Sequence, residues 1–287
     1  MFSALFLAVT LAFSPKDAAT TLSVATRFTN ENTPRDAGTA RGKIAAHWIL
    51  DQVSAKGHDI RQDVFRARTP KGERSFTNLV CEFRGDPDAP WTVLVSHYDT
   101  KPGTGCPGAN DGASTTALLM TLADILGAAG RLPGNVMLVW TDAEECMNAF
   151  YAEGDGFQGS RHAAERLMQR RLNVRAVICA DMLGDRDLRI TVPANGSPAL
   201  TKVALMAAEK ASLADGTVVR GELHVKDDHV AFLDRGFKAI ALIDFEYGSA
   251  PGLNDYWHTP SDTPDKLSAE SLERSGRLLV AMLNILL

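Results

Sequence analysis

Acidic and histidine side chains follow the apolar runs of this sequence at the points where those runs end. In chain order they are His97 and Asp99, Asp111, Glu144 and Glu145, Asp181, Asp227 and Asp228, and His258. Each has an ordinary explanation on its own, because a lone aspartate is often a helix N-cap and a lone histidine is often a core or surface residue. Several segments that each supply such a group favour one shared site. Histidine nitrogen and carboxylate oxygen are zinc ligands, and a catalytic zinc keeps one position open.

The adjacent pair Glu144-Glu145 offers the two kinds of carboxylate that such a site needs. A reaction at a metal requires an acid/base group that is not itself a ligand. If the pair ends a strand, its two side chains point to different sides, so that one binds metal and the other faces substrate. In isolation the pair would be interpreted as a solvated turn.

The elements that must position these residues are short apolar runs that alternate with helical patterns. We expect strands over residues 78–84, 92–97, 136–141, 176–181, 188–192 and 239–244. We expect helices over residues 42–56, 112–129, 160–171, 199–213, 228–235 and 268–286, and a loop over residues 18–41. Buried strands separated by helices predict a largely parallel sheet covered on both faces. Ligands of such sheets lie beyond the carboxyl ends of the strands, where the acids and histidines fall.

Length and composition are those of an ordinary globular protein. The 287 residues allow one large domain or two small ones, and no repeat or long linker divides them. Hydrophobic residues make up 45% and charged residues 23%, both typical of globular domains. The net charge of -5 and the lack of a basic run argue against a nucleic-acid partner.

The first residues, MFSALFLAVTLAF, form an apolar run that is too short to span a bilayer. The run suits a secretory signal peptide. We therefore expect a leader over residues 1–17, a catalytic domain over residues 18–287, and export to the periplasm or the cell exterior without stable membrane insertion. A buried N-terminal helix is the alternative, since no Lys or Arg precedes the run and no A-x-A cleavage site follows it.

The four cysteines match no C-x-x-C zinc module. Cys81 and Cys179 lie in apolar runs, where we expect them to be buried. For Cys106 and Cys146 the sequence leaves a disulfide open, which would suit an exported protein.

Seven short motifs occur in order along the chain. They are His97-Tyr98-Asp99, Gly108-Ala109-Asn110-Asp111, Glu144-Glu145, Gly159-Ser160-Arg161-His162, Asp181-Met182-Leu183-Gly184, Asp227-Asp228-His229 and His258-Thr259-Pro260. This order and spacing resemble the zinc aminopeptidase and glutaminyl cyclase superfamily, metallopeptidase family 28. The resemblance implies a single three-layer α/β domain with a mixed, mostly parallel sheet of about eight strands flanked by helices.

The resemblance implies one of two chemistries. In the aminopeptidases two zinc ions share an aspartate, and the matching ligands here are His97, Asp111, Glu145, Asp181 and His258. Glu144 would then deprotonate the attacking water. In animal-type glutaminyl cyclases one zinc is held by the residues matching Asp111, Glu145 and His258, and it polarises the γ-carbonyl of an N-terminal glutamine. Glu144 would then pass a proton from the α-amine to the departing ammonia, with Asp181 and Asp227 in a hydrogen-bond network beside it.

Four features resemble the cyclase branch more than the aminopeptidases. They are the first motif His-Tyr-Asp-Thr-Lys at residues 97–101, the long segment with Asp155 between Glu145 and Gly159, the Asp227-Asp228 doublet, and Trp257 directly before His258. By this resemblance Trp257 walls a small substrate pocket. A plain packing role is the alternative for that tryptophan.

Three departures weigh against the cyclase branch. Phe150 stands where animal cyclases carry a second pocket tryptophan, Ala241 where cyclases tend to have a histidine, and Ser96 where animal cyclases have a disulfide cysteine. The sequence predicts a zinc-dependent glutaminyl-peptide cyclotransferase that acts on peptide N-termini. A zinc aminopeptidase is the alternative, and an inactive peptidase-like binding domain is the third hypothesis.

Overall fold

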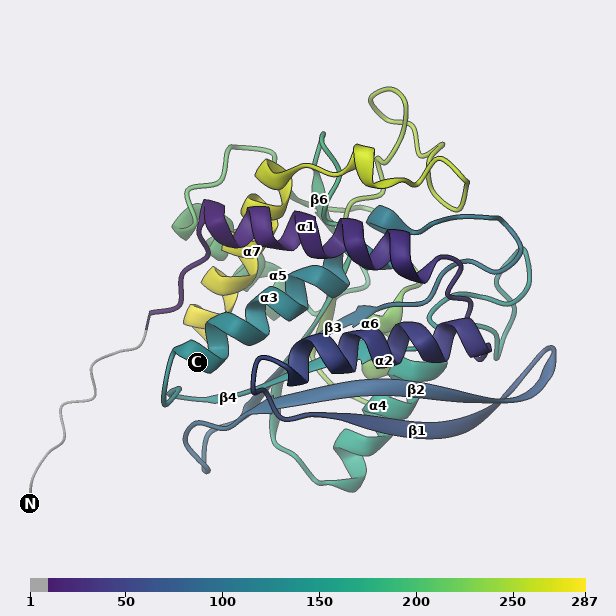
Figure 1. Cartoon of the computed structure of the whole chain (residues 1–287). Coiled ribbons are helices and arrows are strands. Elements are labelled where there is room, and N and C mark those ends of the chain that lie inside the picture. The colour runs from purple at the N-terminus through teal and green to yellow at the C-terminus, as the bar shows by residue number, and fades with distance from the viewer. Residues whose placement is uncertain (1–9) are drawn as a thin grey trace, which may run out of the picture.

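Continuous apolar runs become the central strands of one eight-stranded sheet in the computed structural model, which describes residues 10–287 (Figure 1). The strand order is β1-β2-β4-β3-β5-β8-β6-β7. The four middle strands, β4 (Asn135–Thr141), β3 (Trp91–His97), β5 (Val174–Asp181) and β8 (Ala239–Ile243), are mutually parallel. Their carboxyl ends therefore meet at one edge of the sheet.

The outer strands make the sheet mixed. On one side β1 (Ile60–Thr69) and β2 (Gly72–Phe83) form an antiparallel hairpin, and β2 pairs antiparallel with β4. On the other side β6 (Ile190–Val192) runs antiparallel to β8 and parallel to β7 (Val218–Arg220). The mixed, mostly parallel eight-stranded sheet agrees with the predicted fold class.

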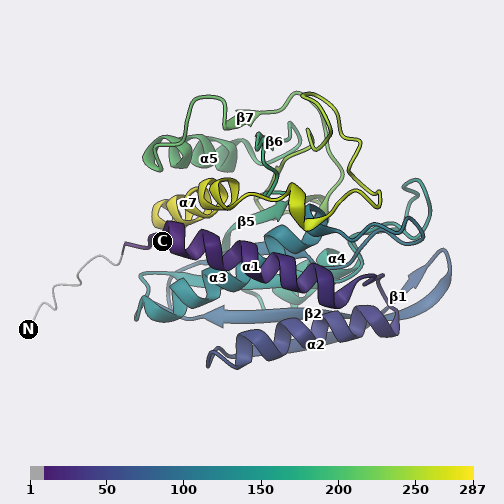
Figure 2. The same ribbon diagram turned by 45° about the horizontal axis from the view of Figure 1, so that its top comes forward.

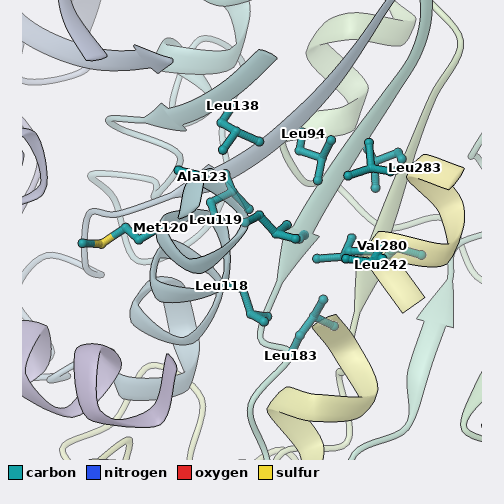
Figure 3. Packing of buried hydrophobic residues seen from close by; sticks show 14 of the residues in the cluster. Leu94, Leu118, Leu119, Met120, Ala123, Leu138, Leu183, Leu242, Val280 and Leu283 are labelled. Atoms are coloured by element: carbon teal, nitrogen blue, oxygen red, sulfur yellow. The ribbon is translucent and has the colours of Figure 1, made fainter. Parts of the chain in front are cut away.

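Helices cover both faces of the sheet (Figures 1 and 2). One face carries α1 (Pro15–Asn32), α2 (Ala40–Ser54), α3 (Thr115–Ala128), α5 (Pro198–Lys210) and α7 (Ala269–Leu286), and the other carries α4 (Gln158–Gln169) and α6 (Asp228–Leu233). In the larger core, Leu118 and Leu119 of α3 pack with Leu94, Leu138 and Leu283 (Figure 3). This packing anchors the rigid frame from which the strand ends project.

The loop predicted over residues 18–41 is wrong, because most of that segment is α1. Ser14 and Asp17 form a capping box, and Pro15 occupies the first turn, where its missing N–H costs nothing. Ala18, Ala25 and Phe28 then bury one side of the helix. The S-x-x-D signal and this spacing were both present in the sequence.

Strands β1 and β7 were not predicted either. Only three of the ten residues of β1, Ile60, Phe65 and Thr69, are buried, so the strand has no regular alternation that would mark an inward face. Strand β7 (Val218–Arg220) is too short to show a periodic pattern in the sequence, and it is stabilised by pairing with β6. Both are outer strands, whose apolar content is weaker than that of the buried centre.

The N-terminal residues that the structure describes belong to the packed domain. Leu11 and Phe13 are buried, and the Phe13 ring lies against Gly276 of α7. Residues 1–9, which hold most of the predicted leader, lie outside the described residues. Within residues 10–287, none of the helices has the length and apolar character needed to cross a membrane.

All four cysteines are buried free thiols. The disulfide left open between Cys106 and Cys146 is therefore not formed. Cys106 instead points its thiol toward Asp262 Oδ2, at 3.7 Å, and Cys146 points toward the carbonyl of Asp155, at 3.8 Å.

Candidate functional site

The strand ends bring the predicted metal ligands into two adjoining groups that share Asp111. One group is Asp111, Glu145 and His258, and the other is His97, Asp111 and Asp181. Within each group one ligand atom per residue lies within 4.8 Å of the others. His97 and Asp181 end β3 and β5, whereas the other three residues come from loops at the same edge.

In the first group, His258 Nε2 lies 2.8 Å from Glu145 Oε1 and 3.3 Å from Asp111 Oδ2. These two carboxylate oxygens are buried and have no hydrogen-bond partner among the described residues. Buried carboxylate oxygens are costly unless a donor or a cation satisfies them. Two carboxylates and one imidazole, converging with free lone pairs, are a donor set that fits zinc.

The electrostatics of the first group reflect crowded negative charge. Burial and the charge of Asp111 raise the pKa of Glu145 to about 7. Burial lowers the pKa of His258, but its close contacts with the carboxylates of Asp111 and Glu145 outweigh that effect and bring the pKa to about 9.

In the second group, His97 Nε2 lies 3.1 Å from Asp111 Oδ1 and 3.1 Å from Asp181 Oδ1. The contact with Asp181 is a hydrogen bond. The two oxygens of Asp111 therefore face two different histidines, which is the arrangement that a bridging ligand requires. His97 is 2% exposed and does not line the cavity among the described residues, whereas Asp111 and Asp181 do.

Glu144 and Glu145 lie in the loop that follows β4, so a strand geometry does not set the directions of their side chains. Ala143, the residue before them, has a left-handed backbone with φ 58°, and this bend aims the two carboxylates differently. The buried carboxylate of Asp99 accepts hydrogen bonds from both backbone amides, of Glu144 and of Glu145, each at 3.2 Å. Asp99 therefore fixes the glutamate pair.

Glu144 is outside both candidate ligand groups but lines the same cavity as Glu145. Burial raises the pKa of Glu144 well above its ordinary value, and the neighbouring acids raise it further against the opposing charge of His97. A raised pKa makes the ionised carboxylate a stronger proton acceptor, which suits general acid/base chemistry.

Asp181 and Asp227 lie on the cavity wall with Glu144. Burial raises the pKa of Asp227 well above its ordinary value, and the charges of Asp181 and Asp228 act in the same direction. One oxygen of Asp227 accepts the backbone N–H of Asp228, whereas its Oδ2 has no hydrogen-bond partner among the described residues. Crowded carboxyl groups of this kind cannot all be ionised, so they share protons.

The cavity has a volume of about 840 Å³, within the range of sites for small organic ligands. Trp257 and Phe150 both line it. Trp257 stacks on His258 with ring centroids 3.8 Å apart, so it forms a wall directly beside the first ligand group. The Phe150 side chain is 86% exposed, which puts its ring at the cavity mouth.

Sequence reasoning assigned no role to three buried residues that hold the site. Arg35 and Asp262 contact the backbone that carries Asp111, and Lys101 lies with its Nζ 3.7 Å from Glu145 Oε2. Arg35 fell in the segment predicted as a loop. Asp262 and Lys101 lie within four residues of the motifs at His258 and His97, and only their burial distinguishes them from solvated charges.

Comparison with known proteins finds both glutaminyl cyclases and an aminopeptidase among the similar chains. Peptidase family M28 matches residues 78–283. A solved glutaminyl cyclase from an Acidobacteriales bacterium is 30% identical, with a TM-score of 0.89 over 100% of this chain and 99% of that one. The glutaminyl-peptide cyclotransferase of Drosophila melanogaster is 26% identical over 258 residues, which cover 80% of this chain and 70% of that protein. Aminopeptidase YwaD of Bacillus subtilis is 28% identical over 196 residues, which cover 66% of this chain and 39% of that protein.

Proposed function

We propose that this chain, which belongs to peptidase family M28, is a zinc-dependent glutaminyl-peptide cyclotransferase that converts the N-terminal glutamine of peptides to pyroglutamate and releases ammonia. One observation carries the proposal beyond family membership. The first ligand group, Asp111, Glu145 and His258, opens into the cavity with two unsatisfied carboxylate oxygens. In the second group His97 hydrogen-bonds to Asp181 and does not line the cavity among the described residues. This difference favours a single zinc, as the cyclase chemistry requires.

Zinc held by Asp111, Glu145 and His258 would polarise the γ-carbonyl of the substrate glutamine. The α-amine nitrogen attacks the γ-carbonyl carbon, and the bond from that carbon to the side-chain nitrogen breaks. Glu144 accepts the proton that leaves the α-amine and delivers it to the departing nitrogen, which leaves as ammonia. The raised pKa of Glu144 suits both halves of this transfer.

Asp181 and Asp227 support the transfer by keeping a proton available beside Glu144. The charge of Asp181 raises the pKa of Asp227, and the charge of Asp227 raises the pKa of Glu144. No water enters the reaction, so the proton that Glu144 takes up is the one it returns. Trp257 forms the wall against which the glutamine side chain packs, and the rest of the peptide leaves through the mouth beside Phe150.

The second candidate function is that of a zinc aminopeptidase. It is favoured by the five-residue ligand set, in which Asp111 Oδ1 faces His97 and Asp111 Oδ2 faces His258. Two ions in this arrangement would share Asp111, and Glu144 would take a proton from water. The similarity to Aminopeptidase YwaD covers less of both chains than the similarity to the cyclases.

The test is mass spectrometry of a short peptide with N-terminal glutamine after incubation with the purified, zinc-loaded protein. Loss of one ammonia with no loss of a residue is the expected result. The same peptide with a blocked α-amine is the control, since it has no nucleophile. Release of free glutamine would contradict the cyclase proposal and establish the aminopeptidase activity instead. Zinc binding without turnover of several peptides would favour the inactive binding domain.

We also propose that the protein is exported, on the strength of the apolar N-terminal run. The boundary predicted between residues 17 and 18 falls inside α1, after the capping residue Ser14 and the buried Phe13. A cleavage that leaves the packed domain intact would fall before Leu11. N-terminal sequencing of the protein recovered from culture medium or periplasm tests both points.

A further inference from the structure

Asp111, the residue shared by both candidate ligand groups, lies in a turn whose backbone conformation is irregular. The turn is a short π-helical segment, Ala109–Ser114, between β3 and α3. Gly108 has φ 65°, Gly112 has φ 90°, and Asp111 itself has the non-helical ψ of 93°. A conformation of this kind persists only when the surrounding structure holds it.

The Arg35 side chain holds the carbonyl groups of this turn. It is completely buried, and its guanidinium donates to the carbonyls of Pro107 and Gly108, each at 2.6 Å, and of Asp111 at 3.4 Å. A further N–H donates to the carbonyl of Tyr98, next to His97. All these acceptors are backbone oxygens, so the hydrogen bonds of Arg35 fix the backbone conformation of the loop.

The Asp262 carboxylate holds the amide groups of the same turn from the other side. Its Oδ1 accepts the backbone N–H of Asn110 at 2.7 Å, and its Oδ2 accepts that of Asp111 at 3.1 Å. Tyr247 donates its hydroxyl to Asp262 at 2.7 Å. Asp262 is 0% exposed and lies four residues after His258, so it joins the His258 segment to the Asp111 turn.

We propose that Arg35 and Asp262 act together as positioning residues, one holding the carbonyls and the other the amides of the turn, so that both oxygens of Asp111 are aimed for metal binding. The proposal rests on the metal site proposed above. A glycine at position 108 is part of the same device, because a Cβ there would lie 2.7 Å from the Arg35 guanidinium and 2.6 Å from the carbonyl oxygen of Asp111. Close approach of the arginine therefore requires the missing side chain.

Charge gives Arg35 a second contribution. Its buried cation is attracted by the carboxylates of Asp262, Asp111 and Asp99, all of which crowd the ligand site. A buried set of acids repels itself when no metal is present. The fixed positive charge of Arg35 offsets part of that repulsion, so the ligand loop keeps its shape before an ion arrives.

The experiment measures zinc affinity by competition with a chromophoric chelator in Arg35→Met, Arg35→Lys and Asp262→Asn. Removing a group that orients a ligand typically weakens metal binding by about 10–100-fold, and we expect this loss in Arg35→Met and Asp262→Asn. Arg35→Lys keeps the charge and some donors, so its loss is expected to be intermediate. Far-UV circular dichroism and thermal unfolding of the metal-free proteins are recorded beside each titration.

Asn135→Ala is the matched control. Asn135 is also buried, and its side chain also holds three backbone groups, of Gly85, Asp86 and Ala89, but it lies at the amino end of β4. We expect it to lower the melting temperature and leave zinc affinity unchanged. Tyr247→Phe, which removes one bond from Asp262 and none from the turn, is expected to lose less than Asp262→Asn.

The proposal is overturned if folded Arg35→Met or Asp262→Asn binds zinc as the parent does, or if Asn135→Ala loses as much affinity as they do. If Arg35→Met does not fold, Arg35→Lys and Asp262→Asn decide the question. A parent protein that binds no zinc would overturn the metal site itself. That failure is distinct from one in which the parent binds zinc tightly and the variants do too.

Discussion

The two candidate ligand groups share Asp111 but differ in what their other members do. In the group with Glu145 and His258, every residue lines the cavity and two buried oxygens lack a hydrogen-bond partner. In the group with His97 and Asp181, the imidazole hydrogen-bonds to a carboxylate and does not line the cavity among the described residues. The first group has the lone pairs and the access that a catalytic ion needs. The second group positions Asp111, the residue that the two groups share.

This comparison teaches how one ligand set serves two chemistries. All five aminopeptidase ligands are present, so residue types alone do not choose between one ion and two. The choice depends on whether the ligand atoms of His97, Asp111 and Asp181 hydrogen-bond to one another or bind a second ion. A hydrogen bond between His97 and Asp181 competes with a second ion, whereas at Glu145 an ion would compete with the ion pairs to His258 and to Lys101.

The largest expected difference is between His258→Gln and His97→Gln. His258→Gln should abolish zinc binding and bring cyclisation below detection, because it removes one of three ligands from the open group. His97→Gln should keep one zinc per chain and lose activity by only about 10-fold, in the range of an outer-shell change. Zinc content by elemental analysis and cyclisation rate are the measurements. Equal loss of zinc in both variants would break the comparison and support a two-ion site.

The next largest effect is expected from Glu144→Gln, which separates chemistry from metal binding. Since Glu144 lies outside both groups, zinc content should not change. Loss of a general acid/base typically costs about 10²–10⁴-fold in rate, and we expect a value at the upper end because Glu144 serves both proton transfers. Retention of full activity would remove Glu144 from the mechanism.

A smaller effect is expected from Asp227→Asn. The Asp227 carboxyl belongs to the crowded acid cluster and to neither ligand group. In a cyclase its loss should slow kcat by about 100-fold through less efficient proton transfer, with zinc content and KM little changed. In an aminopeptidase, where water supplies and removes protons, the loss should be clearly smaller. A rate equal to that of the parent on a glutamine peptide would contradict the shared-proton role.

Much of the frame that carries this comparison was predictable from sequence. The central strands are continuous apolar runs, and β3 and β5 end in His97 and Asp181, which the motifs singled out. The superfamily was correctly identified from those motifs. Long-range packing, by contrast, decided α1 and β1, whose polar faces masked their inner sides.

The supporting residues were not predictable in the same way. Arg35 acts over 63 or more residues of sequence through backbone carbonyls, which leave no mark on residue type. Asp99 holds two glutamate amides, and Asp262 holds the Asp111 turn, yet each is an aspartate near a motif like many solvated ones. Only burial and geometry separate these residues from surface charges. Sequence likewise does not reveal whether His97 and Asp181 lie within hydrogen-bond distance of each other.

The smallest predicted effect concerns Asp185, a buried acid that belongs to neither ligand group. Burial, with the charge of Asp244, raises the pKa of Asp185 to about 6, above the value of about 3.9 for an unfolded chain. The folded state then binds the proton more tightly, so stability is greatest below about pH 4 and falls as the pH rises through 6. Asp185→Asn should therefore resemble the parent at pH 4 and exceed it by about 1 kcal/mol at pH 8, after allowance for solvent screening of a partly buried group.

Urea unfolding of the metal-free proteins at both pH values measures this difference without a contribution from bound ions. The exposed Asp215 provides the control, since Asp215→Asn should leave the pH dependence unchanged. A loss of stability at pH 8 in Asp185→Asn would mean that the carboxylate is satisfied in the folded protein.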